Sequence, residues 1–337
     1  FADINSKVVT GNIILSIISD ITEDGTNALN QWAEEGTGNY TLTIQADGLL
    51  SKVTQRIISA TAVATGVPMI DINGADRVII DGRVGGSGQY LTFRNTNATA
   101  ANAGPTIRFN NSATSDTLRY VIIENNGTTA AQGSVTIGAT GTNTGIVISN
   151  NDIRDAVGGT TGVPSSAVYS NSANNNTITV SNNNIYNWTA SGVLFTTVGN
   201  GCTVSSNNIY QTAARSTALI GVSIAAGSNH TVSSNNFYQT TGTLTAAYTA
   251  ISITGSGNNQ SITNNSIGGT NSSRTGTALT VDASSTNLTG IALTVGTTTA
   301  TKVDSNYISN VAQINVTSGT VFGINISGGN VNVGSIY

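Results

Sequence analysis

The residues best suited to chemistry are four carboxylates in a chain in which only 8% of the residues are charged. They are Asp71, Asp76, Asp81 and Glu124. In the strand register predicted below, Asp81 and Glu124 are outward neighbours about 4.8 Å apart. Carboxylates at that spacing could hold Ca²⁺ or act as an acid and a base. Because Asp76 and Asp81 are also ordinary turn residues, with Arg77 and Arg83 nearby to neutralise them, a structural role stays open.

No catalytic motif accompanies these carboxylates. The one histidine, His230, has no flanking glycine and no carboxylate near it in the sequence. It stands where Cys202, Gln260 and Thr301 stand in other repeats, so we expect it to be structural or solvated. A Ca²⁺-binding Asp-x-Asp-x-Asp-Gly loop is also missing. The sequence therefore predicts no enzyme, no catalytic residue and no cofactor, with Ca²⁺ at Asp81 and Glu124 as the alternative.

Three tyrosines form the second candidate site. Tyr186, Tyr210 and Tyr238 each follow the closing apolar residue of a repeat, and Gln211 and Gln239 come after two of them. Outward tyrosines beside amides could bind a glycan or a partner, since aromatic rings pack on pyranose faces and amides bond to hydroxyl groups. They could equally stack on one another and shield the wall of the fold.

These residues belong to a hexapeptide pattern that recurs along the chain. Each copy begins with a branched aliphatic residue, has Asn in fourth place and closes with Ile or Phe. The copies are 148–153, 180–185, 204–209, 232–237, 262–267 and 303–308, with a partial copy at 123–126. Irregular periods of this size are typical of stacked coils joined by loops of variable length.

The fourth position of the hexapeptide predicts a structural ladder of asparagines. Its members are Asn126, Asn151, Asn183, Asn207, Asn235, Asn265 and Asn306. Asn tolerates the left-handed backbone conformation of a tight bend. Its amide can bond to the same amide one coil away or to the backbone of the bend. A row of ligand-binding asparagines is the alternative.

A second series of strand-like triplets alternates with the hexapeptides. Apolar residues two positions apart turn one face of each triplet inward. The triplets are 70–72, 107–109, 135–137, 168–170, 193–195, 222–224, 251–253, 291–293 and 324–326. With the early pieces 42–44, 57–58 and 78–80, and a further start at 331–333, they predict about nine to ten coils of parallel strands. A third, weaker strand is expected after the hexapeptide, as at 90–93.

The chain is predicted to be one domain over 1–337. Residues 1–40 would be an N-terminal cap or lead-in, and residues 41–337 would form the coils. Only 26–35, followed by Gly36, indicates a short helix; an irregular loop anchored by Trp32 is the alternative. Because the sequence begins at Phe1 with neither Met nor a signal peptide, we expect it to be a segment of a longer chain.

Composition excludes several classes of partner. A net charge of −4 and the lack of a basic cluster argue against nucleic acid and against anionic membranes. No apolar run is long enough for a transmembrane helix. Cys202 is the one cysteine, so no internal disulfide can form.

The two alternating series resemble the right-handed parallel β-helix of the pectate-lyase superfamily, where Asn ladders at one turn are common. This resemblance covers nearly the whole chain. Residues 22–32, 39–44, 71–82 and 104–109 are also similar to β-helix segments of large secreted surface proteins of Bacteroidota, which the type IX system often exports. Residues 116–118 resemble the O-glycosylation sequon of the same bacteria, which makes Thr117 a candidate acceptor.

The resemblance implies a non-catalytic structural or adhesive segment of a secreted cell-surface protein, a rigid stalk or filament that could contact glycans. Its expected partners are the rest of its own longer chain and surface glycans or cell-envelope proteins. The alternative from another class is a polysaccharide-active β-helix enzyme: a lyase, a hydrolase or a tailspike-like depolymerase. Such an enzyme would place Asp71, Asp81 and Glu124 along one groove.

Overall fold

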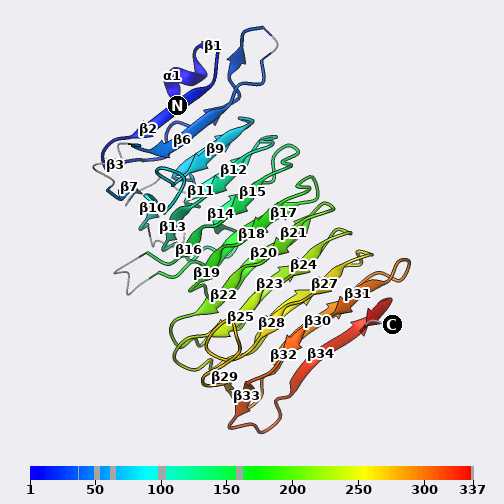
Figure 1. The fold of residues 1–337 in the computed structure, drawn as a ribbon. Helices are drawn as coiled ribbons and strands as arrows, with labels where there is room; N and C mark the ends of the chain where they lie inside the picture. Colours follow the sequence, from blue (N-terminus) through cyan, green and yellow to red (C-terminus); the bar gives the residue numbers. More distant parts are fainter. Residues whose placement is uncertain (37, 49–53, 61–65, 98–103, 157–161, 335–337) are drawn as a thin grey trace.

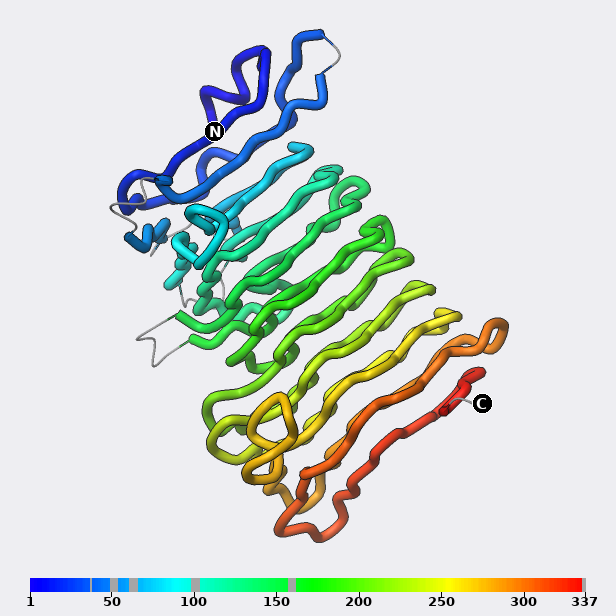
Figure 2. Tube along the Cα trace, in the orientation of Figure 1, coloured from blue at the N-terminus to red at the C-terminus, as the bar shows by residue number. Residues whose placement is uncertain are grey.

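The computed structural model describes residues 1–36, 38–48, 54–60, 66–97, 104–156 and 162–334. They form a right-handed parallel β-helix in which the chain passes through three strands in each coil (Figure 1). The prediction of an all-β fold of nine or ten coils is confirmed, because two of the three long parallel sheets in these residues have ten strands and the third has eleven. The coils follow one another in chain order from the N-terminal to the C-terminal end (Figure 2). At the spacing of parallel strands, ten coils make a rod about 45 Å long.

Each coil contributes one strand to each sheet, and we number the sheets in the order in which the chain visits them. Sheet 1 contains β2 (Ile13–Ile17), β6 (Leu42–Ala46), β9 (Val78–Asp81), β12 (Thr117–Arg119), β15 (Val147–Ser149), β18 (Thr179–Ser181), β21 (Thr203–Ser205), β24 (Thr231–Ser233), β27 (Ser261–Thr263), β31 (Thr301–Asp304) and β35 (Val331–Val333). Sheet 2 contains β3 (Ile21–Thr22), β7 (Arg56–Ala60), β10 (Leu91–Asn95), β13 (Val121–Asn125), β16 (Asp152–Arg154), β19 (Asn184–Tyr186), β22 (Asn208–Gln211), β25 (Asn236–Gln239), β28 (Ser266–Ile267) and β32 (Tyr307–Ile308). Sheet 3 contains β4 (Leu29–Asn30), β8 (Ile70–Asn73), β11 (Ile107–Asn110), β14 (Gly133–Ile137), β17 (Ser166–Ser172), β20 (Ser191–Val198), β23 (Leu219–Ile224), β26 (Tyr248–Ile253), β30 (Leu288–Thr294) and β34 (Val321–Gly328).

The core is a set of aliphatic columns that run along the inside of the rod. In sheet 1, one column of register partners extends from Ile80 through Leu118 and Ile148 to Val303, and its members are buried. Side chains on a strand alternate between its two faces, so every second residue of each strand must be apolar. Burying one such side chain stabilises the fold by about 1.5–3 kcal/mol.

The hexapeptide forms the corner between sheet 1 and sheet 2. Its first two residues end a strand of sheet 1, and its last two belong to a strand of sheet 2. The left-handed residue of the bend is the third of the hexapeptide, with φ of 55–58°, as at Asn150 and Ser206. The expectation that the fourth residue adopts this conformation is therefore wrong, because the fourth residue already follows the bend and its side chain points inward.

Six of the seven predicted ladder asparagines form one column at this corner, and all of them but Asn306 are buried. The amide of Asn183 donates from Nδ2 to Oδ1 of Asn207 at 2.9 Å and to the carbonyl of Ile148 at 2.9 Å. The backbone N–H of Asn183 donates to the same Oδ1 of Asn207 at 2.9 Å. This arrangement repeats from Asn151 to Asn306. The side chain of Asn183 thus satisfies backbone groups at the bend of the preceding coil and also bonds to the asparagine of the next coil.

Asn126 is not a member of this ladder. Register pairs Ile122 with Asp152, so the residue that corresponds to Asn151 is Val121, whose N–H donates to Oδ1 of Asn151 at 3.1 Å. Asn126 lies one strand later, where its N–H donates to the carbonyl of Asn95. Residues 123–126 match the hexapeptide in residue type only. The strand register is set by the inward aliphatic residues, and these place 123–126 at a different point of the coil.

The predicted triplets supply sheet 3, and each coil has three strands. The third strand is not a separate weak segment in most coils, because the closing half of the hexapeptide forms it in sheet 2. The early segment 90–93 does overlap such a strand, β10.

Two predictions about the N-terminal region are wrong. Residues 26–35 form no helix; they contain β4 and β5 (Ala33–Glu34), with Trp32 buried between them. The one helix in the described residues is the four-residue α1 (Ala2–Asn5), and no described helix could cross a bilayer. Coils begin before residue 41, because β2, β3 and β4 already pair with the strands of the next coil.

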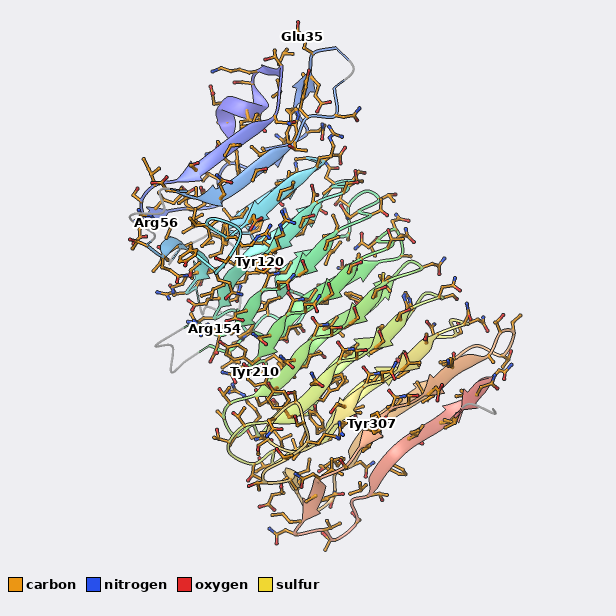
Figure 3. The ribbon with its side chains drawn as sticks, viewed as in Figure 1. Glu35, Arg56, Tyr120, Arg154, Tyr210 and Tyr307 are labelled. Atoms are coloured by element: carbon orange, nitrogen blue, oxygen red, sulfur yellow. The ribbon has the colours of Figure 1, made fainter. Side chains whose placement is uncertain are left out.

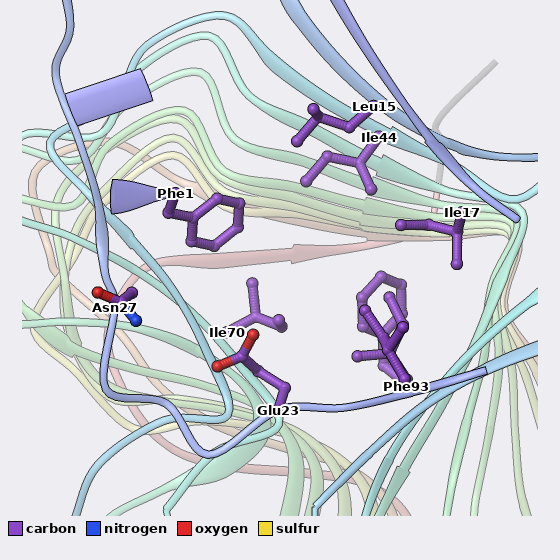
Figure 4. A pocket seen from close by; sticks show the side chains of 10 residues that line it. Phe1, Leu15, Ile17, Glu23, Asn27, Ile44, Ile70 and Phe93 are labelled. Carbon is purple, nitrogen blue, oxygen red and sulfur yellow. The ribbon is translucent and has the colours of Figure 1, made fainter. Parts of the chain in front are cut away.

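The two ends of the rod differ. At the N-terminal end, β1 (Val8–Val9) pairs with β5, and an apolar cavity of about 220 Å³ opens between Phe1, Leu15 and Phe93 at the end of the core (Figure 4). Near the C-terminal end, β29 (Leu279–Asp282) and β33 (Val311–Ile314) form a small side sheet. The last strand of sheet 3, β34, leaves Ile324 and Ile326 exposed although their register partners in the preceding coil, Ile291 and Leu293, are buried.

Replacing Asn207 by Ala tests the ladder. The change removes the acceptor of two Asn183 donors and the donor to Val180 and Asn235, so several buried groups lose their partners. We expect a loss of about 2–4 kcal/mol in the free energy of unfolding, measured by urea denaturation. Asn306→Ala at the partly exposed end of the ladder is the matched control and should cost less. Equal, small losses in both variants would contradict this role.

Candidate functional site

The three carboxylates proposed for a groove lie on three different sheets. Asp71 is on β8 of sheet 3, Asp81 on β9 of sheet 1 and Glu124 on β13 of sheet 2. The register partner of Asp81 in the next coil is Arg119, not Glu124. The predicted carboxylate pair at Asp81 and Glu124 is therefore wrong, and with it the geometry required for Ca²⁺ between them. The error comes from the same misaligned partial copy at 123–126.

Each carboxylate is paired with arginine. Asp71 accepts from Nε and Nη2 of Arg108 at 2.9 and 2.8 Å. Asp81 accepts from Arg83 at 2.7 Å and from Arg119 at 2.8 Å. Burial would raise the pKa of Asp81, but the hydrogen bonds from Arg83 and the charge of Arg119 hold it below its ordinary value. These groups are compensated ion pairs rather than free acids or bases.

Glu124 is the most enclosed of the three carboxylates. Its side chain is fully buried between Arg94 and Arg154, its register partners one coil before and one coil after. Arg154 donates to Oε1 from Nη2 at 2.8 Å, and Arg94 donates to Oε2 from Nε. In the described part of the chain, no three His, Cys, Asp or Glu side chains come together as a metal site would require.

His230 lies inside the rod and its ring nitrogens both contact backbone. Nδ1 accepts from the N–H of Cys202 at 3.2 Å, so Nε2 carries the proton that it shares with the carbonyl of Ala226 at 3.0 Å. Burial lowers the pKa of His230 and raises that of the Cys202 thiol to about 11. Neither group is placed or charged to act as a base or nucleophile.

The three tyrosines form a stacked column on the outer face of sheet 2. Ring centroids are 4.9 Å apart between Tyr186 and Tyr210 and 4.7 Å apart between Tyr210 and Tyr238, with interplanar angles of 15° and 7°. Arg154 continues the column, since its Nη1 donates to the Tyr186 hydroxyl at 2.8 Å. Figure 3 labels Arg154 and Tyr210. Burial raises the pKa of all three hydroxyls.

The stacking limits what this column can bind. Both faces of Tyr210 are covered by its neighbours, and one face of Tyr186 is turned to Arg154, so a pyranose cannot pack against them as it does on an exposed ring. Gln211 and Gln239 do not lie beside the tyrosines, because they are buried and belong to the opposite face of the strand. The prediction that they flank a tyrosine platform is wrong for this reason.

A polar row beside the tyrosines was missed in the sequence. Asn236 donates to Asn208, Asn208 to Asn184, and Asn184 to Asp152, at 2.8–2.9 Å. These residues occupy the fifth position of the hexapeptide, two residues before each tyrosine and on the same face. The repeated Asn at this position was the available signal. Because the amides bond to one another, the row also contributes to stacking.

The comparisons with known proteins find only structures that are distantly similar to this one. No family model and no curated protein matches the sequence. Among solved structures, the surface protein and adhesin PfbA of Streptococcus pneumoniae is 11% identical, with 97% of this chain and 90% of that chain covered and a TM-score of 0.33. The Dettilon tailspike protein gp208 is 13% identical, over 95% of this chain and 62% of that chain, with a TM-score of 0.40. The A-module of the Azotobacter vinelandii mannuronan C-5 epimerase AlgE6 is 12% identical, over 86% and 91%, with a TM-score of 0.39. Likenesses this distant carry no argument about activity or ligand.

The candidate acceptor Thr117 lies on the outer side of sheet 1, between its register partners Ile79 and Val147. The preceding Asp116 is buried and accepts from the N–H of Val78 at 2.8 Å with Oδ1, whereas Oδ2 has no partner in the described residues. Modification of Thr117 stays a prediction. Burial, together with the nearby charge of Asp76, raises the pKa of Asp116 to about 8.

Replacing Glu124 by Gln tests the buried ion triad. The variant keeps the shape of the side chain but leaves the charges of Arg94 and Arg154 uncompensated on neighbouring coils. We expect a loss of about 1–3 kcal/mol in the free energy of unfolding, at the low end for a buried pair because both arginines are partly exposed. Glu35→Gln makes the same change at an exposed site and should have little effect. If the two variants unfold alike, the triad does not stabilise the rod.

Replacing Asp116 by Asn tests its raised pKa. Between its ordinary pKa of 3.8 and about 8, the folded protein keeps a proton that the unfolded chain releases, so stability falls as the pH rises through this window. Asn does not titrate. The difference between the melting temperature of Asp116→Asn and that of the wild type should therefore rise, in favour of the variant, by an amount on the order of 5 °C from about pH 4.5 to 8.5. A gap that stays constant with pH would refute it.

Proposed function

We propose that this chain is a non-catalytic structural segment, a rigid stalk or part of a filament, of a secreted protein displayed at the cell surface. The observation that supports the proposal best is the unbroken coil-to-coil pairing of the three sheets, in which the described strands shift register only at Ser170/Asn171 and Leu293/Thr294 of sheet 3. Strands of sheet 1, for example, pair without a register shift from β2 to β35. A stack bonded in this way along its length resists bending between coils.

The placement of the acidic residues favours a stalk over an enzyme. A lyase or hydrolase needs carboxylates that converge on one substrate and keep free ionisation. Here Asp71, Asp81 and Glu124 are on three sheets and each is bound to arginine. These carboxylates compensate the charges of arginines, most of which lie on neighbouring coils.

The C-terminal face of the rod fits a continuing β-helix. Val321, Ile324 and Ile326 of β34 and Val333 of β35 are exposed. Edge strands usually carry a Pro or a charged residue that discourages pairing with another strand, and β34 carries neither. A further apolar coil stacked in register on these two strands would bury these side chains as earlier coils bury theirs in sheets 1 and 3.

Incubation with polysaccharides tests the non-catalytic assignment. The purified protein would be mixed with pectate, alginate, starch and mannan, and new reducing ends and unsaturated products would be measured. We expect no product above a heat-denatured control, while known lyases and hydrolases serve as positive controls. Release of oligosaccharide that is lost in Asp71→Asn or Glu124→Gln would contradict the stalk and support the polysaccharide-active enzyme.

A further inference from the structure

A polar hollow of about 250 Å³ lies on the outer face of sheet 3, far along the coil from the tyrosine column on sheet 2. Its floor is formed by Arg108, Thr136 and Tyr169, which are register partners on β11, β14 and β17. Gln132, in the loop before β14, contributes to the rim.

A glycine at one edge of the hollow makes room for an asparagine side chain. Asn110, Gly138 and Asn171 occupy corresponding positions at the ends of the same three strands. The place that a Cβ on Gly138 would take is filled by the side chain of Asn110, whose Oδ1 accepts from the N–H of Thr140 at 3.1 Å. The amides of Asn110 and Asn171 both line the hollow.

The groups around the space are fixed and electrically balanced. Asp71 holds Nε and Nη2 of Arg108, so the guanidinium is immobile and its charge is compensated. Thr136 is occupied with the backbone of Gly133. Oε1 of Gln132 is buried without a partner in the described residues, which is costly unless a ligand donates to it. A suitable ligand is therefore uncharged and carries hydroxyl donors.

We propose that this hollow binds one neutral hexopyranose unit of a glycan. The hydroxyl groups of the sugar bond to Gln132, to Nδ2 of Asn110 and to the amide of Asn171, above the floor formed by Arg108, Thr136 and Tyr169. Because Asp71 compensates the charge of Arg108, the hollow offers no net positive charge to an acidic sugar. The inference rests on the proposed display at the cell surface and adds to it a glycan contact on sheet 3 instead of at the tyrosine column.

Calorimetric titration with maltotriose, cellotriose, mannotriose and trigalacturonic acid tests the proposal. The wild type should bind at least one neutral trisaccharide, with a Kd on the order of 1 mM, and bind trigalacturonic acid more weakly. Gly138→Ala adds a methyl group that only the flexible Asn110 side chain must avoid, and it should weaken binding at least about ten-fold. Gln132→Ala should also weaken it.

Two control variants make the result specific. Gly328→Ala adds the same methyl group on sheet 3, where only Cγ2 of Thr294 lies within contact distance, and should bind as the wild type does. Tyr238→Leu should also leave binding unchanged. Unaltered binding in Gly138→Ala, loss in Tyr238→Leu, or no binding by the wild type would overturn the site. Cleavage of the bound trisaccharide would instead overturn the non-catalytic function and leave the site standing.

Discussion

Parallel pairing of each strand with the same strand one coil away is the constraint on which the whole structure depends. It places equivalent residues of successive coils about 4.8 Å apart in columns. Each side chain must therefore be compatible with the side chains at the same position in the coils before and after it. Neutral groups can repeat, as the asparagines do from Asn151 to Asn306 and the tyrosines from Tyr186 to Tyr238. Charged groups must alternate in sign, as Arg94, Glu124 and Arg154 do. This requirement explains why so few residues of the chain are charged.

The same constraint limits where binding can arise. On a wall of repeating columns, the outer side chains use their hydrogen bonds and ring faces on one another, as the row from Asp152 to Asn236 and the tyrosine stack show. A ligand needs polar groups that the columns leave without partners. In the described residues, Oε1 of Gln132 at the hollow on sheet 3 is such a group, which is why this hollow is a better candidate than the more conspicuous tyrosines.

The repeat made much of the fold predictable, because period-two aliphatic residues and the corner asparagines follow directly from the strand geometry. Glu124 could not be placed correctly from the sequence. Residues 123–126 look like the start of a hexapeptide, which would put them in sheet 1, but Ile123 pairs with Ile153 in sheet 2. Gln211 was misplaced for a related reason: adjacent residues of a strand lie on opposite faces. The helix predicted at 26–35 does not form, because β4 pairs with a strand of sheet 3 and Trp32 is buried in the core. The hollow is lined by residues of three successive coils, so no local pattern could reveal it.

Native-state hydrogen exchange tests most directly whether coil-to-coil stacking holds the molecule together. The account predicts the slowest exchange in the middle coils, above all at the backbone amides of Asn183, Asn207 and Asn235, which donate to the ladder. Exchange should quicken towards β2 at one end and β34 at the other, where one side of the strand is unpaired. Fast exchange at the ladder amides, or end strands as protected as the middle, would contradict it.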